Sequence, residues 1–210
     1  MHVYFVRHGE TELNRRFVHQ SPSTPLSPRG REQALTAAEY LRPMNPDILL
    51  TSDYTRAQET ARLIGSVLTL APQADARFRE VERPSKLCGR SLFHPETYWY
   101  VFNSVVRRGN PRWHYDDAEN FSDIYDRVEK TLAYLESFYG THDSIAIVSH
   151  TMFINLMVAY MCKNRILAVR DLLPAFLHIK QMGNGEVVGI KYTGPSDKQV
   201  CTWQLVHHAR

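Results

Sequence analysis

The chain has 210 residues and a formal net charge of +3, with 43% hydrophobic and 22% charged residues. This composition is typical of a globular protein with a buried core. The net charge is too small for the strongly basic field of a nucleic-acid-binding protein. The sequence also lacks an apolar run of roughly 20 residues, the length that crosses a bilayer. Cys88, Cys162 and Cys201 lie far apart without a CxxC pair, which argues against a disulfide framework or a thiolate zinc site. We expect a cytoplasmic protein that binds neither nucleic acid nor membrane.

Regularly spaced apolar side chains divide the chain into alternating strands and helices. Short continuous apolar runs predict buried strands at residues 3–6, 46–52 and 143–150. Helical spacing predicts helices over residues 27–42, 57–68, 96–107, 121–138 and 152–161, the first capped by Ser27. The C-terminal part predicts a hairpin of residues 175–180 and 187–192 and a last strand within 200–206. We expect one α/β domain over residues 1–210, a three-layer α/β/α sandwich with a mostly parallel central sheet.

Chemically notable residues follow three of the predicted strands. The first strand ends in Arg7 and His8, the second is followed by Arg56 in the opening turn of the next helix, and the third ends in His150. In open α/β sheets, ligands bind beyond the carboxyl ends of the strands. A single histidine is more often structural, and Arg56 could pair with an acid of its own helix. If the strands are neighbours, however, two arginines and two histidines meet in one crevice.

Such a cluster is strongly positive and suits an oxyanion. Guanidinium groups form bidentate hydrogen bonds with phosphoryl oxygens, and helix N-termini add amide donors. A neutral imidazole is also a competent nucleophile, and the phosphohistidine that it forms can be hydrolysed in a second step. The residues therefore favour a site that binds a phosphoryl group and also reacts with it.

Four ordered segments carry a specific signature: RHGETELN (7–14), PLSPRGREQA (25–34), TSDYTRAQETA (51–61) and IVSHT (147–151). Together they resemble the motifs of the histidine phosphatase superfamily, which has the phosphoglycerate mutase-like fold. The short RHG motif alone would be weak, but the order and approximate spacing agree from Val3 to about Ile154. The resemblance and the strand-end pattern point to the same residues.

The resemblance implies a role for each residue of the cluster. His8 is similar to the family's nucleophile, which attacks phosphorus and becomes a phosphohistidine. Arg7, Arg56 and His150 resemble the clamp on the phosphoryl oxygens, and Asn14 a further polar contact. The resemblance implies no metal and no other cofactor, since the arginines neutralise the phosphate.

The family also protonates the leaving group with a carboxylic acid that follows the second helix. Both Glu80 and Glu82 lie in this part of the chain, in the segment RFREVERPS. Glu80 stands where the L-x-E pattern of the family places the acid, so we favour it. The other carboxylate is then expected to pair with Arg79 or Arg83.

Residues 84–118 lack a clear periodicity and form the expected lid, a substrate-specificity insertion over the crevice. The stretch from residue 82 to 118 carries seven aromatic side chains, at positions 93, 98, 99, 100, 102, 113 and 115. We expect most of them to lie in the core. Those that face the crevice would select the substrate together with a basic residue such as Arg15, Arg16, Arg83, Lys86 or Arg90.

The sequence departs from the family pattern at Ser21 and Ser23, where a glycine and an aspartate are usual, and at Thr151, where a glycine is usual. We expect only local changes in the shape of the pocket. The closely spaced glycines of phosphoglycerate mutases are absent after Glu80, so we favour a phosphatase over a phosphomutase. A non-catalytic phosphate-binding module is a third possibility. We rank it lower, because such a module would have lost the nucleophile or a clamp residue, and here all of them are present. The substrate is left open between a phosphorylated small molecule and a phosphoprotein, as is the oligomeric state.

Overall fold

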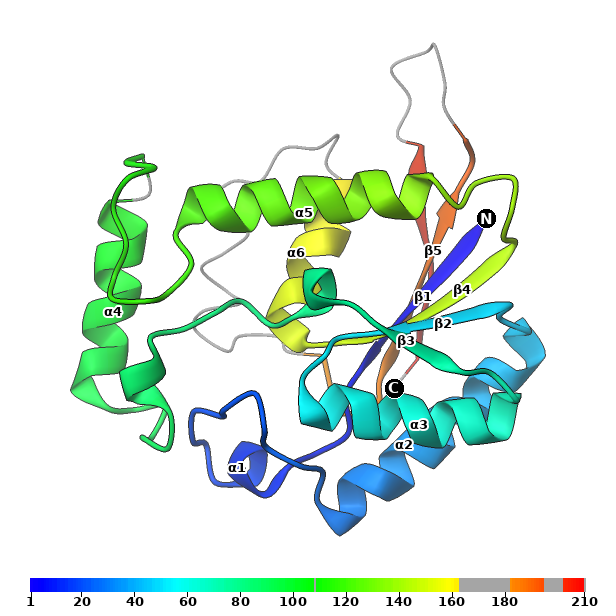
Figure 1. Ribbon diagram of the computed structural model, residues 1–210, viewed down its shortest axis with the longest axis horizontal. Helices are drawn as coiled ribbons and strands as arrows, with labels where there is room; N and C mark the ends of the chain where they lie inside the picture. Colours follow the sequence, from blue (N-terminus) through cyan, green and yellow to red (C-terminus); the bar gives the residue numbers. More distant parts are fainter. Residues whose placement is uncertain (108, 163–181, 195–201, 210) are drawn as a thin grey trace.

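The computed structural model describes residues 1–107, 109–162, 182–194 and 202–209 of the chain. These residues contain a six-stranded sheet with the order β3-β2-β4-β1-β5-β6 (Figure 1). Its strands are β1 (His2–Arg7), β2 (Ile48–Thr51), β3 (Pro72–Ala74), β4 (Ser144–Ser149), β5 (Val187–Tyr192) and β6 (Trp203–Ala209). The first four run parallel to one another, whereas β5 and β6 pair antiparallel to their neighbours. The mostly parallel sheet is therefore confirmed.

Helices cover both faces of this sheet. The α-helices of the described residues are α1 (Glu12–Arg15), α2 (Pro28–Leu41), α3 (Thr55–Leu68), α4 (Pro95–Val106), α5 (Phe121–Glu136) and α6 (Thr151–Cys162). Figure 1 shows α2 and α3 on one side of the sheet and α5 and α6 on the other, which gives the predicted three layers. The short helix α1 and the helix α4 lie outside these layers, near the carboxyl ends of the parallel strands (Figure 1).

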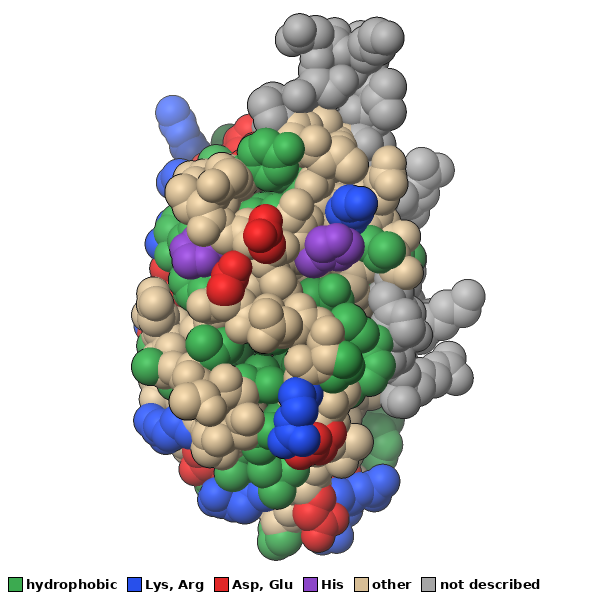
Figure 2. All heavy atoms as spheres, turned by 90° about the vertical axis from the view of Figure 1, so that its right-hand side faces the viewer, with side chains coloured by type: hydrophobic (Ala, Val, Ile, Leu, Met, Phe, Trp, Pro, Cys, Tyr) green, Lys and Arg blue, Asp and Glu red, His purple; other side chains and the backbone are tan. Residues whose placement is uncertain are grey.

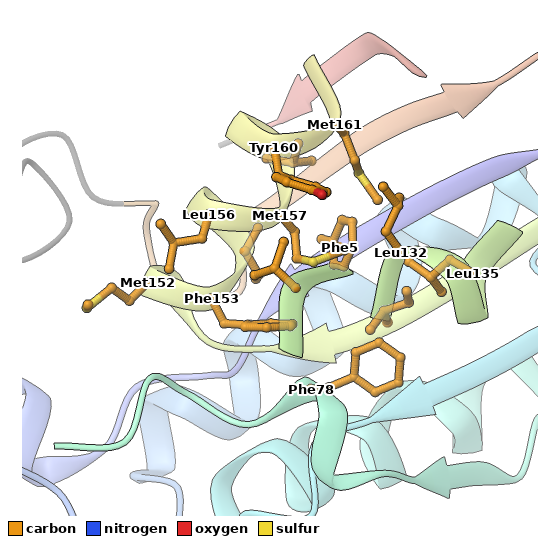
Figure 3. Packing of buried hydrophobic residues seen from close by; sticks show 14 of the residues in the cluster. Phe5, Phe78, Leu132, Leu135, Met152, Phe153, Leu156, Met157, Tyr160 and Met161 are labelled. Atoms are coloured by element: carbon orange, nitrogen blue, oxygen red, sulfur yellow. The ribbon is translucent and has the colours of Figure 1, made fainter. Parts of the chain in front are cut away.

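Successive residues of β1 belong to two different hydrophobic cores. Val3 and Phe5 pack with side chains of α5 and α6, whereas Tyr4 and Val6 pack with side chains of α2 and α3. Figure 3 shows Phe5 on the first side, among residues of α5 and α6. Because neighbouring strand residues point to opposite faces, a strand covered on both sides needs a continuous apolar run. This explains why the run at residues 3–6 identified the strand.

The structure differs from the sequence prediction at three places. The short edge strand β3 and the four-residue helix α1 were not predicted, because neither is long enough to show a period. The last strand runs from Trp203 to Ala209 and so ends later than the predicted range of 200–206. The predicted strand at 175–180 lies outside the described residues, and β5 pairs with β1 and β6.

The prediction that most aromatic residues of the lid lie in the core is wrong. Phe93, Tyr98, Trp99 and Phe102 are all more than half exposed, and only Tyr100 of the seven is fully buried. The reason lies in α4, whose buried positions are Thr97, Tyr100 and Asn103. This helix therefore turns a narrow polar stripe inward and leaves aromatic rings on the outside.

The surface away from α4 is of mixed character. Figure 2 shows the side of the molecule opposite to α4, where acidic, basic and hydrophobic side chains are interspersed. Within the described part of the chain, no helix is both long and apolar enough to cross a membrane.

Candidate active site

The carboxyl ends of three neighbouring strands form the floor of the site. β4 lies between β2 and β1, and Arg7 at the end of β1 is in register with Ser149 at the end of β4. The rings of His8 and His150 have their centroids 5.1 Å apart, and Nε of Arg56 lies 3.2 Å from Nε2 of His8. The structure therefore brings these residues together at the carboxyl ends of the three strands.

Two glycines allow the loop that carries His8 to pack closely on α2. A Cβ atom on Gly9 would lie 2.1 Å from the carbonyl oxygen of Gly30, and one on Gly30 would lie 2.1 Å from that of Glu10. Such an approach is possible only for residues without side chains. The amide of Gly9 also donates to Oγ1 of Thr60 in α3 over 3.0 Å. The loop after β1 is thereby fixed against both helices of this layer.

One nitrogen of His8 is held by the backbone and the other faces the cluster. Nδ1 lies 2.7 Å from the carbonyl oxygen of Gly9, which can only accept, so Nδ1 carries the proton. Nε2 therefore keeps its lone pair, toward which Nε of Arg56 donates. Burial, together with the charges of Arg56 and Arg7, holds the pKa of His8 well below the usual histidine value. The imidazole is thus neutral, with its lone pair on Nε2.

His150 is completely buried beside His8. Its Nε2 lies 2.9 Å from Oγ of Ser52, the residue after β2, and its ring meets the ring of Tyr54 edge-on at 5.2 Å. Burial and the positive charge of Arg56 lower the pKa of His150 well below its usual value. Both histidines are therefore neutral in the free protein.

The two arginines bring positive charge to a place with little access to water. Arg56 is only 4% exposed and donates through Nη1 to the carbonyl oxygen of Ser21 over 3.0 Å. Arg7 donates through Nη1 to the carbonyl oxygen of Met182. Burial lowers the pKa of each guanidinium to about 10. Both groups remain cationic at neutral pH, so this end of the sheet favours an anion.

Three buried polar atoms of this region lack a hydrogen-bond partner among the described residues. They are Nε of Arg7, Nδ1 of His150 and Oγ1 of Thr151. A buried polar group without a partner costs about 1–3 kcal/mol. A ligand with several oxygen atoms would relieve this cost at more than one of these positions.

The two candidate acids have different surroundings. The carboxylate of Glu80 lies at the N-terminus of α6, where it accepts from the amides of Phe153 at 3.0 Å and Met152 at 3.3 Å. Its negative charge partly offsets the lowering of the pKa of both clamp arginines. Glu82 instead forms an ion pair with Arg79 at 3.4 Å, as expected for the second carboxylate. Both carboxylates line the cavity, and Glu80 is the one whose charge acts on Arg7 and Arg56.

Asn14 lies at the edge of the same site. Its side-chain oxygen accepts from the amide of Thr11 at 3.2 Å and from Nδ2 of Asn184 at 3.4 Å. Asn184 also donates to the carbonyl oxygen of His8 over 3.0 Å. Asn184 was not predicted as a site residue, because the segment MGNGE has only the pattern of a turn before β5. No local pattern reveals that this turn reaches the loop after β1.

A cavity of about 650 Å³ rises from this floor. Its wall comes from the loop after α1 and from residues 80–101, the segment that includes the beginning of the predicted lid. Thr151 and Met152 at the start of α6 complete the wall. Among the described residues, no three His, Cys, Asp or Glu side chains are grouped so as to hold a metal ion.

The class of protein follows from this fold and this site. The family model of the histidine phosphatase superfamily (branch 1) matches residues 3–194. The chain belongs to the histidine phosphatase superfamily. The predicted family, the fold and an enzyme of the histidine phosphatase type are thereby confirmed.

Individual relatives carry different names within this superfamily. The chain is 32% identical over 164 residues to the probable phosphoglycerate mutase GpmB of Klebsiella pneumoniae subsp. pneumoniae. The aligned region covers 76% of this chain and 74% of that relative. It resembles the structure of the mycobacterial glucosyl-3-phosphoglycerate phosphatase in complex with VO3, with a TM-score of 0.77, 25% identity and coverage of 100% and 99%. It also resembles the alpha-ribazole phosphatase of Shigella flexneri, with a TM-score of 0.73, 25% identity and coverage of 98% and 96%.

Proposed function

We propose that this protein is a metal-independent phosphatase that hydrolyses a phosphomonoester through a phosphohistidine on Nε2 of His8. One observation carries the proposal: Gly9 holds the proton of His8 on Nδ1, while Nε2 lies among the arginines at the floor of the cavity. A neutral imidazole whose lone pair on Nε2 points toward guanidinium groups suits attack on a phosphoryl group bound by those groups.

The phosphoryl group would lie at the carboxyl ends of β1 and β4. Its oxygens would accept from Arg7, Arg56 and Nδ1 of His150, with Ser52 holding the other nitrogen of His150. Such donors stabilise the charge that spreads over the oxygens in the transition state. Asn14 is proposed as a further contact at the edge of the site.

Thr151 is a further proposed contact. Its hydroxyl is buried, lines the cavity and has no partner among the described residues. It follows His150 directly and stands at the start of α6, where amide groups already favour negative charge. A hydroxyl at this place can donate to a phosphoryl oxygen or to the oxygen of the leaving alcohol.

Glu80 is proposed as the acid and base of the two steps. In the first step Nε2 of His8 bonds to phosphorus, the bond from phosphorus to the alcohol oxygen breaks, and protonated Glu80 gives its proton to that oxygen. In the second step the Glu80 carboxylate takes a proton from water, and the water oxygen bonds to phosphorus. The bond to Nε2 then breaks and inorganic phosphate leaves.

A phosphomutase is the alternative, because relatives such as that of Klebsiella pneumoniae are named as probable mutases. Two features favour the phosphatase. The glycine pattern of mutases is absent after Glu80, and solved structures named as phosphatases match the chain over nearly its whole length.

The size of the cavity lies within the range of small-molecule sites, which favours a phosphorylated metabolite over a phosphoprotein. The dispersed cysteines support a place in the cytoplasm.

A panel of phosphorylated metabolites tests this proposal. The purified protein is incubated with each compound in the presence of a chelator, and released phosphate and isomerised product are both measured. We expect phosphate release that needs no added metal and no bisphosphorylated activator. Isomerisation without phosphate release would identify a mutase instead, and the absence of turnover with every compound would support a binding module.

A further inference from the structure

The basic side chains that the sequence suggested as substrate contacts differ in whether an acid neutralises them. Arg15 pairs with Glu12 at 2.7 Å. Lys86 and Arg90 both pair with Glu96, each at 2.8 Å. Each of these three cations thus has an acidic partner within the protein, and neither Lys86 nor Arg90 is among the residues that line the cavity.

Arg83 lines the cavity and has no carboxylate within 4.0 Å in the part of the chain that is described. Its Nη1 lies 3.3 Å from Nδ1 of His19, and its Nη2 lies 3.7 Å from Sδ of Met152. Neither of these neighbours carries a negative charge, so no ion pair compensates the charge of Arg83. The side chain is half-buried, and an uncompensated charge in such a position is well placed to bind an acid.

The surroundings of Arg83 fix its position. His19 is buried and its Nε2 bonds to Oγ1 of Thr97 in α4 over 2.9 Å. Met152 is tied in turn to the carboxylate of Glu80 through its backbone amide. Arg83 therefore lies between the lid and the proposed acid, on the side of the cavity where the leaving alcohol would be.

Part of the wall of this cavity is apolar. The rings of Phe17 and Phe93 contact each other with centroids 5.9 Å apart, and both rings are more than half exposed. Tyr98 and Val101 of α4 line the same cavity. Exposed aromatic rings around a cavity are surfaces on which a planar or bulky apolar group can pack.

We propose that Arg83 binds a carboxylate on the leaving alcohol, and that the substrate is a phosphomonoester of a bulky apolar alcohol with one such acid. This inference rests on the proposed phosphatase function and adds the class of substrate to it. The planar guanidinium forms two parallel hydrogen bonds with a carboxylate, whereas the rings of Phe17 and Phe93 contact the apolar part.

A pair of aryl phosphates tests the inference. The probes are 4-(carboxymethyl)phenyl phosphate and 4-(carbamoylmethyl)phenyl phosphate, which have similar shapes and similar phenol leaving groups but differ by one negative charge. We expect kcat/KM to be about 10- to 100-fold higher for the carboxylate probe, which is typical of a hydrogen bond to a charged group. Equal values for the two probes would overturn the inference.

Arg83→Gln assigns the preference to this residue. The substitution should remove the preference by raising KM for the carboxylate probe, with little effect on the amide probe. Arg15→Gln is the matched control, because Arg15 is a neighbouring cation that is already paired, and it should leave the preference intact. An equal loss of activity on both probes would mean that Arg83 acts on the transferred phosphoryl group, and would overturn the inference. Inhibition by vanadate should be unchanged in Arg83→Gln if the phosphate site is intact.

Phe17→Ala tests the apolar part. Loss of one ring contact should raise KM for both probes by a similar factor of about 2 to 10. An unchanged KM for both probes would overturn this part. If the wild-type protein hydrolyses 4-nitrophenyl phosphate but neither probe, the substrate class is wrong; if it hydrolyses none of the three, the phosphatase function itself fails.

Discussion

Nε of Arg56 donates to Nε2 of His8 across 3.2 Å, and both side chains are almost completely buried. The lone pair of His8 is thus engaged by Arg56 in the free protein. A phosphoryl oxygen would compete for the same N–H group, so binding of the anion would release the lone pair for attack. In the proposed mechanism, this contact therefore links binding of the phosphoryl group to release of the lone pair of His8.

Arg56→Lys should lower kcat/KM for any phosphomonoester by about 10²–10³-fold. Lysine keeps the charge but lacks the fork that reaches both the carbonyl oxygen of Ser21 and the floor of the site. Steady-state kinetics measures the effect, and Arg62→Lys is the control, because Arg62 is an exposed arginine of the same helix. A loss of similar size in both variants would show that the effect is not specific to the site.

Glu80→Gln should lower kcat by about 10²–10⁴-fold, since glutamine cannot give a proton to the leaving alcohol. The loss should be largest for alkyl phosphates and smaller for aryl phosphates with acidic phenols, whose leaving groups need less protonation. Glu82→Gln removes the ion pair with Arg79 and should leave the rate nearly unchanged. If Glu82→Gln shows the larger loss, with the same dependence on the leaving group, the assignment of the acid must be reversed.

Thr151→Val should lower kcat/KM by about 10- to 100-fold, because it replaces the buried hydroxyl by a methyl group of similar size. Thr151→Ser keeps the hydroxyl and should retain most of the activity. Wild-type activity of the valine variant would mean that the hydroxyl contacts neither the phosphoryl group nor the leaving oxygen. Thermal unfolding of both variants checks that the start of α6 is preserved.

The two lowered histidine pKa values predict how stability depends on pH. In the unfolded chain both histidines take up a proton near pH 6.5, whereas in the folded protein their pKa values lie well below this value. The unfolded state therefore binds more protons below pH 6.5, and the free energy of unfolding should fall as the pH decreases from 6.5 toward the folded pKa values. Above pH 6.5 this contribution is constant.

Urea unfolding of the wild type and His8→Gln at several pH values checks this prediction. Each histidine contributes a slope of at most about 1.4 kcal/mol per pH unit, so the variant should lose that part of the slope. Identical slopes in the two proteins would mean that His8 is protonated in the folded state.

The sequence predicted those parts of the fold that have a strong local pattern. β1 and β4 are continuous apolar runs because both of their faces are covered, and the residues that follow these strands share one edge because the strands are parallel neighbours. β3 has three residues with a proline at its start and lies at the edge of the sheet, so it shows no such run.

The site was predictable where it follows strand ends and not where it depends on distant segments. His8, Arg56 and His150 each follow a recognisable strand. The contact of Asn184 with the backbone of His8 joins residues 176 positions apart, and no motif marks it. The exposed rings of α4 were misjudged because a helix with a polar buried stripe has the reverse of the usual pattern.

The proposed function depends above all on the phosphohistidine on His8. The measurement is a rapid acid-free quench of the protein with a ³²P-labelled substrate during turnover, followed by mass spectrometry of the peptide that contains residue 8. We expect an alkali-stable, acid-labile phosphoryl group on Nε2 of His8 that appears and decays at rates compatible with kcat, and no label in His8→Gln. Turnover without any labelled enzyme, or label on another residue that persists in His8→Gln, would contradict the claim.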